Sequence, residues 1–371
     1  MSALNYKAAG VDIDVGDSAS RIMYEASRRT WDYRRDLPGF VETPAEFFAG
    51  VRSVDAGRFA NALVGLNFDG VGTKIEIAER MRYHATIAHD LFAMVCDDAA
   101  VRGAEPALFG SILDCSRISL DVVKQLASGM IEAAKRSRVA VMNGEIAELG
   151  GRVQGFGPNA YNWGGAVFWI ARRDRLLSGN RIRTGHAIIA AMERGFRSNG
   201  ISLVRKVFSE TYGQNWHNHS FKRKPLGTWV LEPSIIYTRL LVDLTGGYSG
   251  EPTGDITGAA HVTGGGVPGK LARLLYATGL GATLDNLYEP AEIMRFVQQK
   301  CEINDREAYR TWNMGQGLLI VTPNEKTVLG RAKELGFRAT KVGEITKEKG
   351  IRILSRGVSE PGAWLNFGLE R

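Results

Sequence analysis

The chain has 371 residues, more than one hydrophobic core usually supports, so two domains of ordinary size are expected. Its 44% hydrophobic and 23% charged residues are average for a globular protein, which excludes a disordered, collagen-like or coiled-coil chain. The formal charge of +7 comes from scattered basic residues, without one long basic stripe. This distribution argues against nucleic-acid binding and favours a small phosphorylated, anionic substrate.

No apolar stretch approaches the ~20 residues that a membrane-spanning helix needs, so no membrane partner is expected. The first residues lack a secretory or organelle-targeting pattern, and the expected location is cytoplasmic. The cysteines, Cys96, Cys115 and Cys301, form no CxxC pair and are odd in number. They predict reduced thiols and neither a disulfide framework nor a zinc site.

Strand-like and helix-like segments alternate from about residue 60 onward, which predicts an α/β (α+β) fold. In the first half, strands are expected at 63–68, 108–113, 140–142 and 166–171, and helices at 85–101 and 120–136. In the second half, strands are expected at 187–192 and 317–321 and again after residue 340, and helices at 202–209, 233–244, 269–277 and 325–335. The charged segment 172–183 separates the halves, which predicts domains at 1–175 and 176–371.

A glycine-rich turn, Asp69-Gly70-Val71-Gly72-Thr73-Lys74, follows the first predicted strand. Its carboxylate suits a metal, its glycines let backbone N–H groups approach phosphate oxygens, and its lysine balances their charge. The Walker spacing GxxxxGK[ST] is absent, so an ordinary turn is the alternative. The composition of the turn favours a nucleotide phosphate.

Three carboxylates, Asp90, Asp97 and Asp98, recur on one face of the next predicted helix. Gathered carboxylates repel one another unless a cation joins them, although a solvated acidic face would give the same pattern. Mg²⁺ usually binds one or two carboxylates together with substrate phosphates. Asp69 with Asp98, and Glu145 after the third predicted strand, are the expected ligands.

Two glycine-containing segments stand out in the second half. Arg197-Ser198-Asn199-Gly200 opens a predicted helix, where free N–H groups favour an anion, with a simple N-cap as the alternative. His261 shortly precedes Gly264, Gly265 and Gly266, which places an imidazole beside glycines that allow close backbone approach. A purely structural histidine is the alternative there.

Six segments, in this order, resemble the successive motifs of the aminoimidazole ribonucleotide synthetase family across nearly the whole chain. They are residues 6–14, 69–74, 98 with 103–106, 198–206, 261–266 and 309–315. The resemblance implies a two-domain ATP-dependent synthetase fold. In it, an N-terminal mixed α/β domain forms the sheet of a homodimer, and a C-terminal layered α/β domain covers the site.

The resemblance also implies an activity, namely ATP-driven ring closure of formylglycinamidine ribonucleotide in purine synthesis. ATP and Mg²⁺ would be bound by Lys7, Asp12, Asp69, Gly70, Gly72, Thr73, Lys74 and Asp98, with Asp69, Asp98 and Glu145 as metal ligands. Substrate would be bound by Ser198, Asn199, Gly200, Gly264 and Gly265. The implied catalytic residues are His261, Lys74 and Asp69: His261 as proton carrier or charge stabiliser, and Lys74 by offsetting charge on the transferred phosphate.

The chain departs from the family pattern at several motifs. It has Arg197 where the family usually has histidine, and Asp97 where the family has asparagine. Asn143 and Ile146 replace a glycine and a threonine, and residues 155–165 also differ from the expected acidic segment. A changed substrate is therefore an open alternative.

The competing functions are another ATP-dependent phosphotransferase of the same superfamily and a non-catalytic nucleotide-binding paralogue. Relatives of selenophosphate synthetase or thiamine-phosphate kinase represent the first, although no cysteine precedes Cys96 to act as the former's catalytic thiol. Loss of Asp69, Lys74 or His261 would favour the second, and all three are present.

Overall fold

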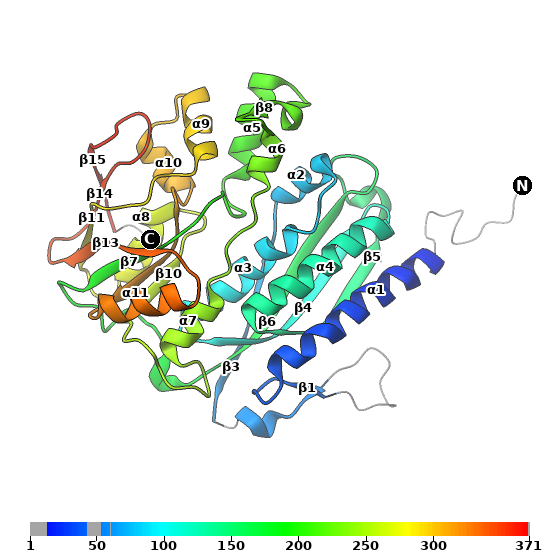
Figure 1. The fold of residues 1–371 in the computed structure, drawn as a ribbon, viewed down its shortest axis with the longest axis horizontal. Helices are drawn as coiled ribbons and strands as arrows, with labels where there is room; N and C mark the ends of the chain where they lie inside the picture. The colour runs from blue at the N-terminus through cyan, green and yellow to red at the C-terminus, as the bar shows by residue number, and fades with distance from the viewer. Residues whose placement is uncertain (1–12, 43–52, 60, 370–371) are drawn as a thin grey trace, which may run out of the picture. The chain divides into compact units, whose positions relative to one another are not determined.

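The computed structural model describes residues 13–42, 53–59 and 61–369, which form two compact units (Figure 1). Unit 1 comprises Met1–Cys96 and Pro106–Ile170, and unit 2 comprises Asp97–Glu105 and Ala171–Arg371. The division at Ile170 lies close to the boundary expected at residue 175. The division at Cys96 is not predictable from the sequence, because it falls inside the helix 87–100, whose periodicity continues across it.

Unit 1 is built on a four-stranded sheet in the order β3-β6-β4-β5, flanked by helices (Figure 1). The strands are β3 (Leu63–Gly70), β6 (Tyr161–Ala171), β4 (Glu105–Cys115) and β5 (Ala140–Glu148); β1 (Val41–Glu42) and β2 (Ser53–Val54) form a separate pair. The helices are α1 (Ile13–Trp31), α2 (Lys74–Met81), α3 (Ile87–Ala100) and α4 (Leu120–Ser137). β4 and β5 are parallel, as the crossover helix α4 between them requires, and α1 packs on α4 and β5.

One face of this sheet carries exposed apolar side chains. Along β3, Val64, Leu66 and Phe68 alternate with less exposed residues and are 51%, 58% and 71% exposed, and Ile112 on β4 is 57% exposed. The period of two residues places the three β3 side chains on the same face. Exposed apolar side chains aligned on one strand face in this way are typical of a protein–protein interface.

Unit 2 contains a seven-stranded mixed sheet in the order β10-β12-β7-β13-β11-β14-β15. The strands are β10 (Gly258–His261), β12 (Gln316–Thr322), β7 (Ala187–Met192), β13 (Ala339–Thr346), β11 (Gly281–Leu284), β14 (Ile351–Leu354) and β15 (Trp364–Phe367). All neighbours are antiparallel except β11 and β14. Strand β12 is buried along its whole length, as expected for a strand covered on both faces.

Unit 2 also contains seven α-helices and a small separate β-hairpin among its described residues. The helices are α5 (Ile201–Tyr212), α6 (Leu226–Val230), α7 (Thr238–Thr245), α8 (Gly266–Leu275), α9 (Glu292–Lys300), α10 (Asp305–Thr311) and α11 (Glu325–Glu334); the hairpin is β8 (Ser220–Phe221) and β9 (Lys224–Pro225). Residues of α7 and α11 pack on β7 and β12, with Leu240, Ile189, Ile320 and Val328 in one core. Within the described ranges, no helix has the length and apolar character needed to cross a membrane.

Two of the differences between the predicted elements and the structure concern the site. The strand predicted at 140–142 continues to Glu148, so Asn143 and Glu145 lie within β5, because pairing with β4 extends that far. The helix predicted at 233–244 begins only at Thr238. At the first turn of this helix, the carboxylate of Asp97 accepts hydrogen bonds from Tyr237 N and Thr238 Oγ1.

Candidate functional site

Unit 1 has a cavity of about 600 Å³ on the exposed face of its sheet. The lining is formed by Phe68 and Asp69, residues 110–112, 143–145 and 164–166, one group from each of the four strands. Asp69 on β3 and Glu145 on β5, two of the three metal ligands predicted from the sequence, line this cavity from the two edge strands of the sheet. With the nearby oxygens of Ser111 and Asn143, they offer the hard oxygen donors that Mg²⁺ prefers.

Two glycines of the cavity lining stand where the chain packs too closely for a side chain. A Cβ on Gly144 would lie 3.1 Å from Ser111 O, and one on Gly165 would lie 2.5 Å from a ring carbon of Phe109. Gly72, in the turn after β3, has a φ of 69° with open space around its Cβ position, so backbone conformation explains glycine there. The predicted turn therefore has the open backbone that a phosphate group could approach.

Lys74 is the first residue of α2 and is fully buried. Its Nζ lies 2.8 Å from Oδ1 of Asp90, which is also fully buried. Asp90 is therefore paired within unit 1, whereas Asp97 and Asp98 pair with Arg197 and His261 in unit 2. Each of the three carboxylates therefore has a basic partner, which offsets their mutual repulsion, and the assignment of Asp98 as a metal ligand stays a prediction. The role of Lys74 in ATP binding stays a prediction.

His261, the last residue of β10, is only 3% exposed, and its Nε2 lies 3.1 Å from Asp98 Oδ1. Burial lowers the pKa of His261 to about 4, although the hydrogen bond to Asp98 acts in the opposite direction. The neutral ring therefore donates from Nε2 to the carboxylate and leaves Nδ1 unprotonated. Nδ1 is buried and has no hydrogen-bond partner among the described residues.

The predicted substrate-binding segments pack together in unit 2. A Cβ on Gly264 would lie 3.7 Å from Asn199 Oδ1, and a Cβ on Gly200 would lie 2.4 Å from Trp312 Nε1. A Cβ on Gly266 would lie 1.9 Å from Tyr309 O, so no side chain fits there. The motifs at 198–200, 264–266 and 309–312, far apart in the sequence, therefore form one cluster next to His261.

Polar atoms in this cluster lack partners. In the part of the chain that the structure describes, the shielded Oγ of Ser198 and Nε1 of Trp312 make no hydrogen bond. A buried polar group left unpaired costs about 1–3 kcal/mol, so Ser198 Oγ is a candidate ligand contact, whereas Trp312 Nε1 is packed closely against Gly200. Because Ser198 Oγ bonds no N–H group of α5, the alternative of a simple N-cap is not supported for this residue.

Positive charge gathers near Asp98. Lys270, on α8, is partly buried, and this burial is the main cause that lowers its pKa. The positive charges of Arg273 and Arg102 lower the pKa further, whereas the negative charge of Asp98 raises it. The local excess of cations would favour an anionic ligand.

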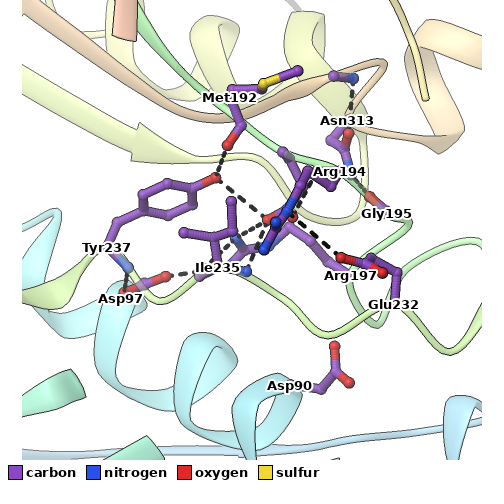
Figure 2. A network of polar contacts seen from close by, with 12 residues as sticks. Asp90, Asp97, Met192, Arg194, Gly195, Arg197, Glu232, Ile235, Tyr237 and Asn313 are labelled. Carbon is purple, nitrogen blue, oxygen red and sulfur yellow. Dashed lines mark hydrogen bonds and ion pairs between the residues drawn. The ribbon is translucent and has the colours of Figure 1, made fainter. Parts of the chain in front are cut away.

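Arg197 is not available to a ligand. Its fully buried guanidinium donates from Nη1 to Glu193 Oε2 and Ile235 O, both at 3.0 Å, and from Nη2 to Asp97 Oδ2 at 3.2 Å (Figure 2). The sequence showed two separate departures from the family pattern at 97 and 197. Their contact was not predictable, because the two residues are 100 positions apart.

Two predicted ligand residues, Lys7 and Asp12, lie outside the described residues. Across residues 13–42, 53–59 and 61–369, no three His, Cys, Asp or Glu side chains come together as a metal site. Asp69 and Glu145 both line the unit 1 cavity, and Asp98 belongs to unit 2.

Both halves of the chain match models of one family. Residues 55–163 match the N-terminal domain of AIR synthase related protein, and residues 183–355 match its C-terminal domain. The chain therefore belongs to the AIR synthase related protein family, as its motifs predicted.

Within that family, the chain is similar to enzymes named phosphoribosylformylglycinamidine cyclo-ligase. It is 31% identical to that of Desulfotalea psychrophila over 347 residues, which are 92% of this chain and 93% of the relative. It is 32% identical to that of Bacillus pumilus over 351 residues, 93% of this chain and 96% of the relative. The Synechocystis enzyme is 32% identical over 358 residues, which are 94% of this chain and 99% of the relative.

Solved structures share the fold. HypE of E. coli, a hydrogenase maturation protein, has a TM-score of 0.61 at 15% identity, covering 94% of this chain and 97% of its own. Thiamine-monophosphate kinase from Stenotrophomonas maltophilia has a TM-score of 0.59 at 16% identity, with 92% and 97% covered. T. maritima PurL complexed with FGAR has a TM-score of 0.54 at 15% identity, covering 96% of this chain and 55% of its own. The predicted fold class is confirmed.

Proposed function

We propose that the chain closes the imidazole ring of formylglycinamidine ribonucleotide, using ATP, in purine synthesis. The observation that carries this proposal is the cluster in unit 2, where Asp98 orients His261 and Asn199 lies against Gly264. Curated relatives at 31% and 32% identity over more than nine-tenths of the chain are named for this reaction.

The chemistry requires an activated amide and a proton acceptor. An amide oxygen is a poor leaving group until ATP phosphorylates it; the amidine nitrogen then attacks the formyl carbon, the C–N bond forms, and the C–O bond breaks to release phosphate. The attacking nitrogen must lose a proton. The unprotonated Nδ1 of His261 is suited to accept it, because Asp98 fixes the ring from the other side.

The nucleotide is assigned to the unit 1 cavity. Asp69 is proposed as a Mg²⁺ ligand there, with Glu145 as a further acidic group of the cavity lining, and the turn at 69–74 would present N–H groups to phosphate oxygens. When bound, Mg²⁺ supplies positive charge that offsets the charge on the phosphates. Lys7 and Asp12 are proposed to complete the nucleotide site, and the cytoplasmic location stays a prediction.

The phosphate of the substrate is assigned to the cations near Asp98. Lys270 is partly buried, the exposed Arg102 and Arg273 act on it electrostatically, and an anion would stabilise such a group of like charges. A phosphorylated substrate satisfies this requirement, whereas an uncharged amide would not.

A homodimer is proposed through the exposed face of the unit 1 sheet. Val64, Leu66, Phe68 and Ile112 present large apolar side chains on one surface of the strands. Burial against the same surface of a second copy would remove this area from water, and a twofold axis makes such an interface self-complementary.

The departures at Asp97 and Arg197 support retention of the family substrate. They add one negative and one positive charge, and both are used within the protein interior. Because the two charges pair with each other in the interior, the replacements at 97 and 197 do not change the net charge that the site offers to a ligand. The alternatives, another ATP-dependent phosphotransferase or a non-catalytic nucleotide-binding paralogue, are decided by experiment.

The test is release of ADP and phosphate from Mg-ATP with formylglycinamidine ribonucleotide, beside thiamine monophosphate and the dephosphorylated riboside of the substrate. We expect turnover with the ribonucleotide and a strongly raised KM for the riboside. Turnover only with thiamine monophosphate would establish the phosphotransferase alternative. ATP binding without turnover on any compound would establish the silent paralogue.

A further inference from the structure

A buried ion pair links two positions at which the chain departs from its family. Arg197 Nη2 donates to Asp97 Oδ2 at 3.2 Å, and both side chains are fully buried (Figure 2). The family pattern has histidine and asparagine at these positions, so the exchange introduces one charge of each sign. Glu193 also pairs with Arg197 at 3.0 Å, so Asp97 is one of two buried carboxylates that hold the guanidinium in place.

Arg197 is fixed on several sides. Besides its bonds to Glu193 and Ile235, its guanidinium carbon lies 5.3 Å from the centre of the Tyr237 ring. Its backbone has a φ of 58°, in the left-handed region that long side chains seldom adopt. Such a backbone conformation persists only where surrounding contacts hold it in place. In this chain, Arg197 lies in the segment that connects β7 with Ser198, Asn199 and α5.

Asp97 is equally fixed. Its Oδ1 accepts hydrogen bonds from Tyr237 N at 2.9 Å and Thr238 Oγ1 at 2.8 Å, while Oδ2 accepts from Arg197. Both oxygens are engaged, so the side chain holds the last turn of α3 in one orientation. The next residue along that turn is Asp98, the partner of His261.

We propose that Asp97 and Arg197 act as one positioning pair, which sets Asp98 against His261 and Asn199 against the glycine turn at the same time. The pair touches no substrate. Each partner is adjacent in the chain to a segment of the site, so a shift of either partner moves Asp98 or Ser198 and Asn199. A misplacement of about 1 Å can cost about 10²-fold in rate, which makes a buried pair of this kind kinetically visible.

The kinetic part of the test rests on the proposed function. Asp97→Asn and Arg197→Met each remove one charge with little change in volume. We expect each to lower kcat with formylglycinamidine ribonucleotide by about 10- to 100-fold while the affinity for Mg-ATP is unchanged. Nitrogen-15 NMR of His261, assigned with His261→Gln, gives a readout that needs no substrate. The wild type should show the Nε2-protonated ring, and both variants should show a mixture of the two tautomers.

Two further variants separate positioning from stability. Asp243→Asn makes the same chemical change at a carboxylate of unit 2 that pairs with Arg331. It should lower the free energy of unfolding and leave kcat and the His261 signal unchanged. The double variant Asp97→Asn/Arg197→His restores the family residues, and should recover part of the kcat that Arg197→His alone loses.

The outcomes are distinct. If Asp97→Asn and Arg197→Met lose stability as Asp243→Asn does, but keep kcat and the His261 signal, the pair is only structural and the proposal is overturned. If the wild type shows no turnover, the proposed function fails, and the His261 signal decides the positioning: unchanged tautomers in both variants overturn it. Should Arg197→Met not fold, Arg197→Lys, which keeps the charge but cannot bridge both carboxylates, takes its place.

Discussion

Lys74 Nζ lies 2.8 Å from Asp90 Oδ1, and neither side chain is exposed to solvent. Lys74→Met leaves a buried carboxylate without its ion-pair partner, which typically costs about 3–5 kcal/mol of unfolding free energy. Urea denaturation followed by circular dichroism measures this loss. Asp32→Asn, which breaks the exposed pair with Arg35, is the control and should cost at most about 1 kcal/mol. Equal losses in the two variants would contradict the structural role of Lys74.

The unit 1 cavity predicts a Mg²⁺-dependent effect on nucleotide binding. Asp69→Asn and Glu145→Gln each remove one anionic oxygen from the cavity, so both should weaken ATP binding in the presence of Mg²⁺ and change it little in EDTA. Calorimetric titration measures both conditions. Asp55→Asn, at an exposed carboxylate outside the cavity, should behave as the wild type. Unchanged affinity in both cavity variants would remove these residues from the metal site.

Elements with local signals were predictable from the sequence. β7 is a short apolar run preceded by a charged segment, and its predicted bounds agree with the structure. α1 was not predicted, because its buried residues are small or polar, including Ala19, Ser27 and Thr30. Its attachment depends on distant contacts, such as the hydrogen bond from Val141 N to Thr30 Oγ1 at 2.7 Å. No periodicity within residues 13–31 could reveal that partner.

The same limit applies to the site. His261, Asn199 and the glycines were identified by residue type and motif, which are properties of the sequence. Their partners were not, because the contact of His261 with Asp98 joins residues 163 positions apart. Helical spacing places the acidic residues on α3, as the structure has them, but it carries no information on the basic side chains from other segments that pair with them individually.

The exposed face of unit 1 predicts a dimer that one charge disrupts. Leu66 is 58% exposed on that face, and Leu66→Lys would place an ammonium group in the proposed interface. Analytical ultracentrifugation at micromolar concentration should find a dimer for the wild type and a monomer for the variant. Trp364→Lys, at an apolar residue of unit 2 that is 41% exposed, should remain dimeric. A monomeric wild type would refute the dimer, and a dimeric Leu66→Lys would move the interface elsewhere.

Acid should destabilise the chain through His84. Its Nδ1 lies 3.0 Å from the Tyr161 hydroxyl, and burial lowers the pKa of His84 from 6.5 to about 4. The folded state therefore binds a proton less readily than the unfolded state, so the contribution is constant above pH 6.5 and stability falls as the pH drops from 6.5 toward 4. The loss should reach about 2 kcal/mol at pH 5.

His84→Gln removes this proton uptake. Urea unfolding of the wild type and the variant at pH 5 and pH 7.5 should show the variant gaining relative stability at the lower pH. Parallel pH dependence in the two proteins would mean that His84 is not the group responsible.

The final prediction concerns His261, whose Nε2 is bonded to Asp98 and whose Nδ1 is unprotonated. His261→Gln should lower kcat by about 10²–10⁴-fold, as expected for loss of a general base, and should leave Mg-ATP affinity unchanged. Asp98→Asn keeps the imidazole but weakens its orientation, so its loss of kcat should be smaller. If Asp98→Asn instead weakens Mg-ATP binding, Asp98 is a metal ligand as its motif predicted. If His261→Gln retains wild-type kcat, the proton is accepted by another group and the unit 2 cluster binds substrate without taking part in the reaction.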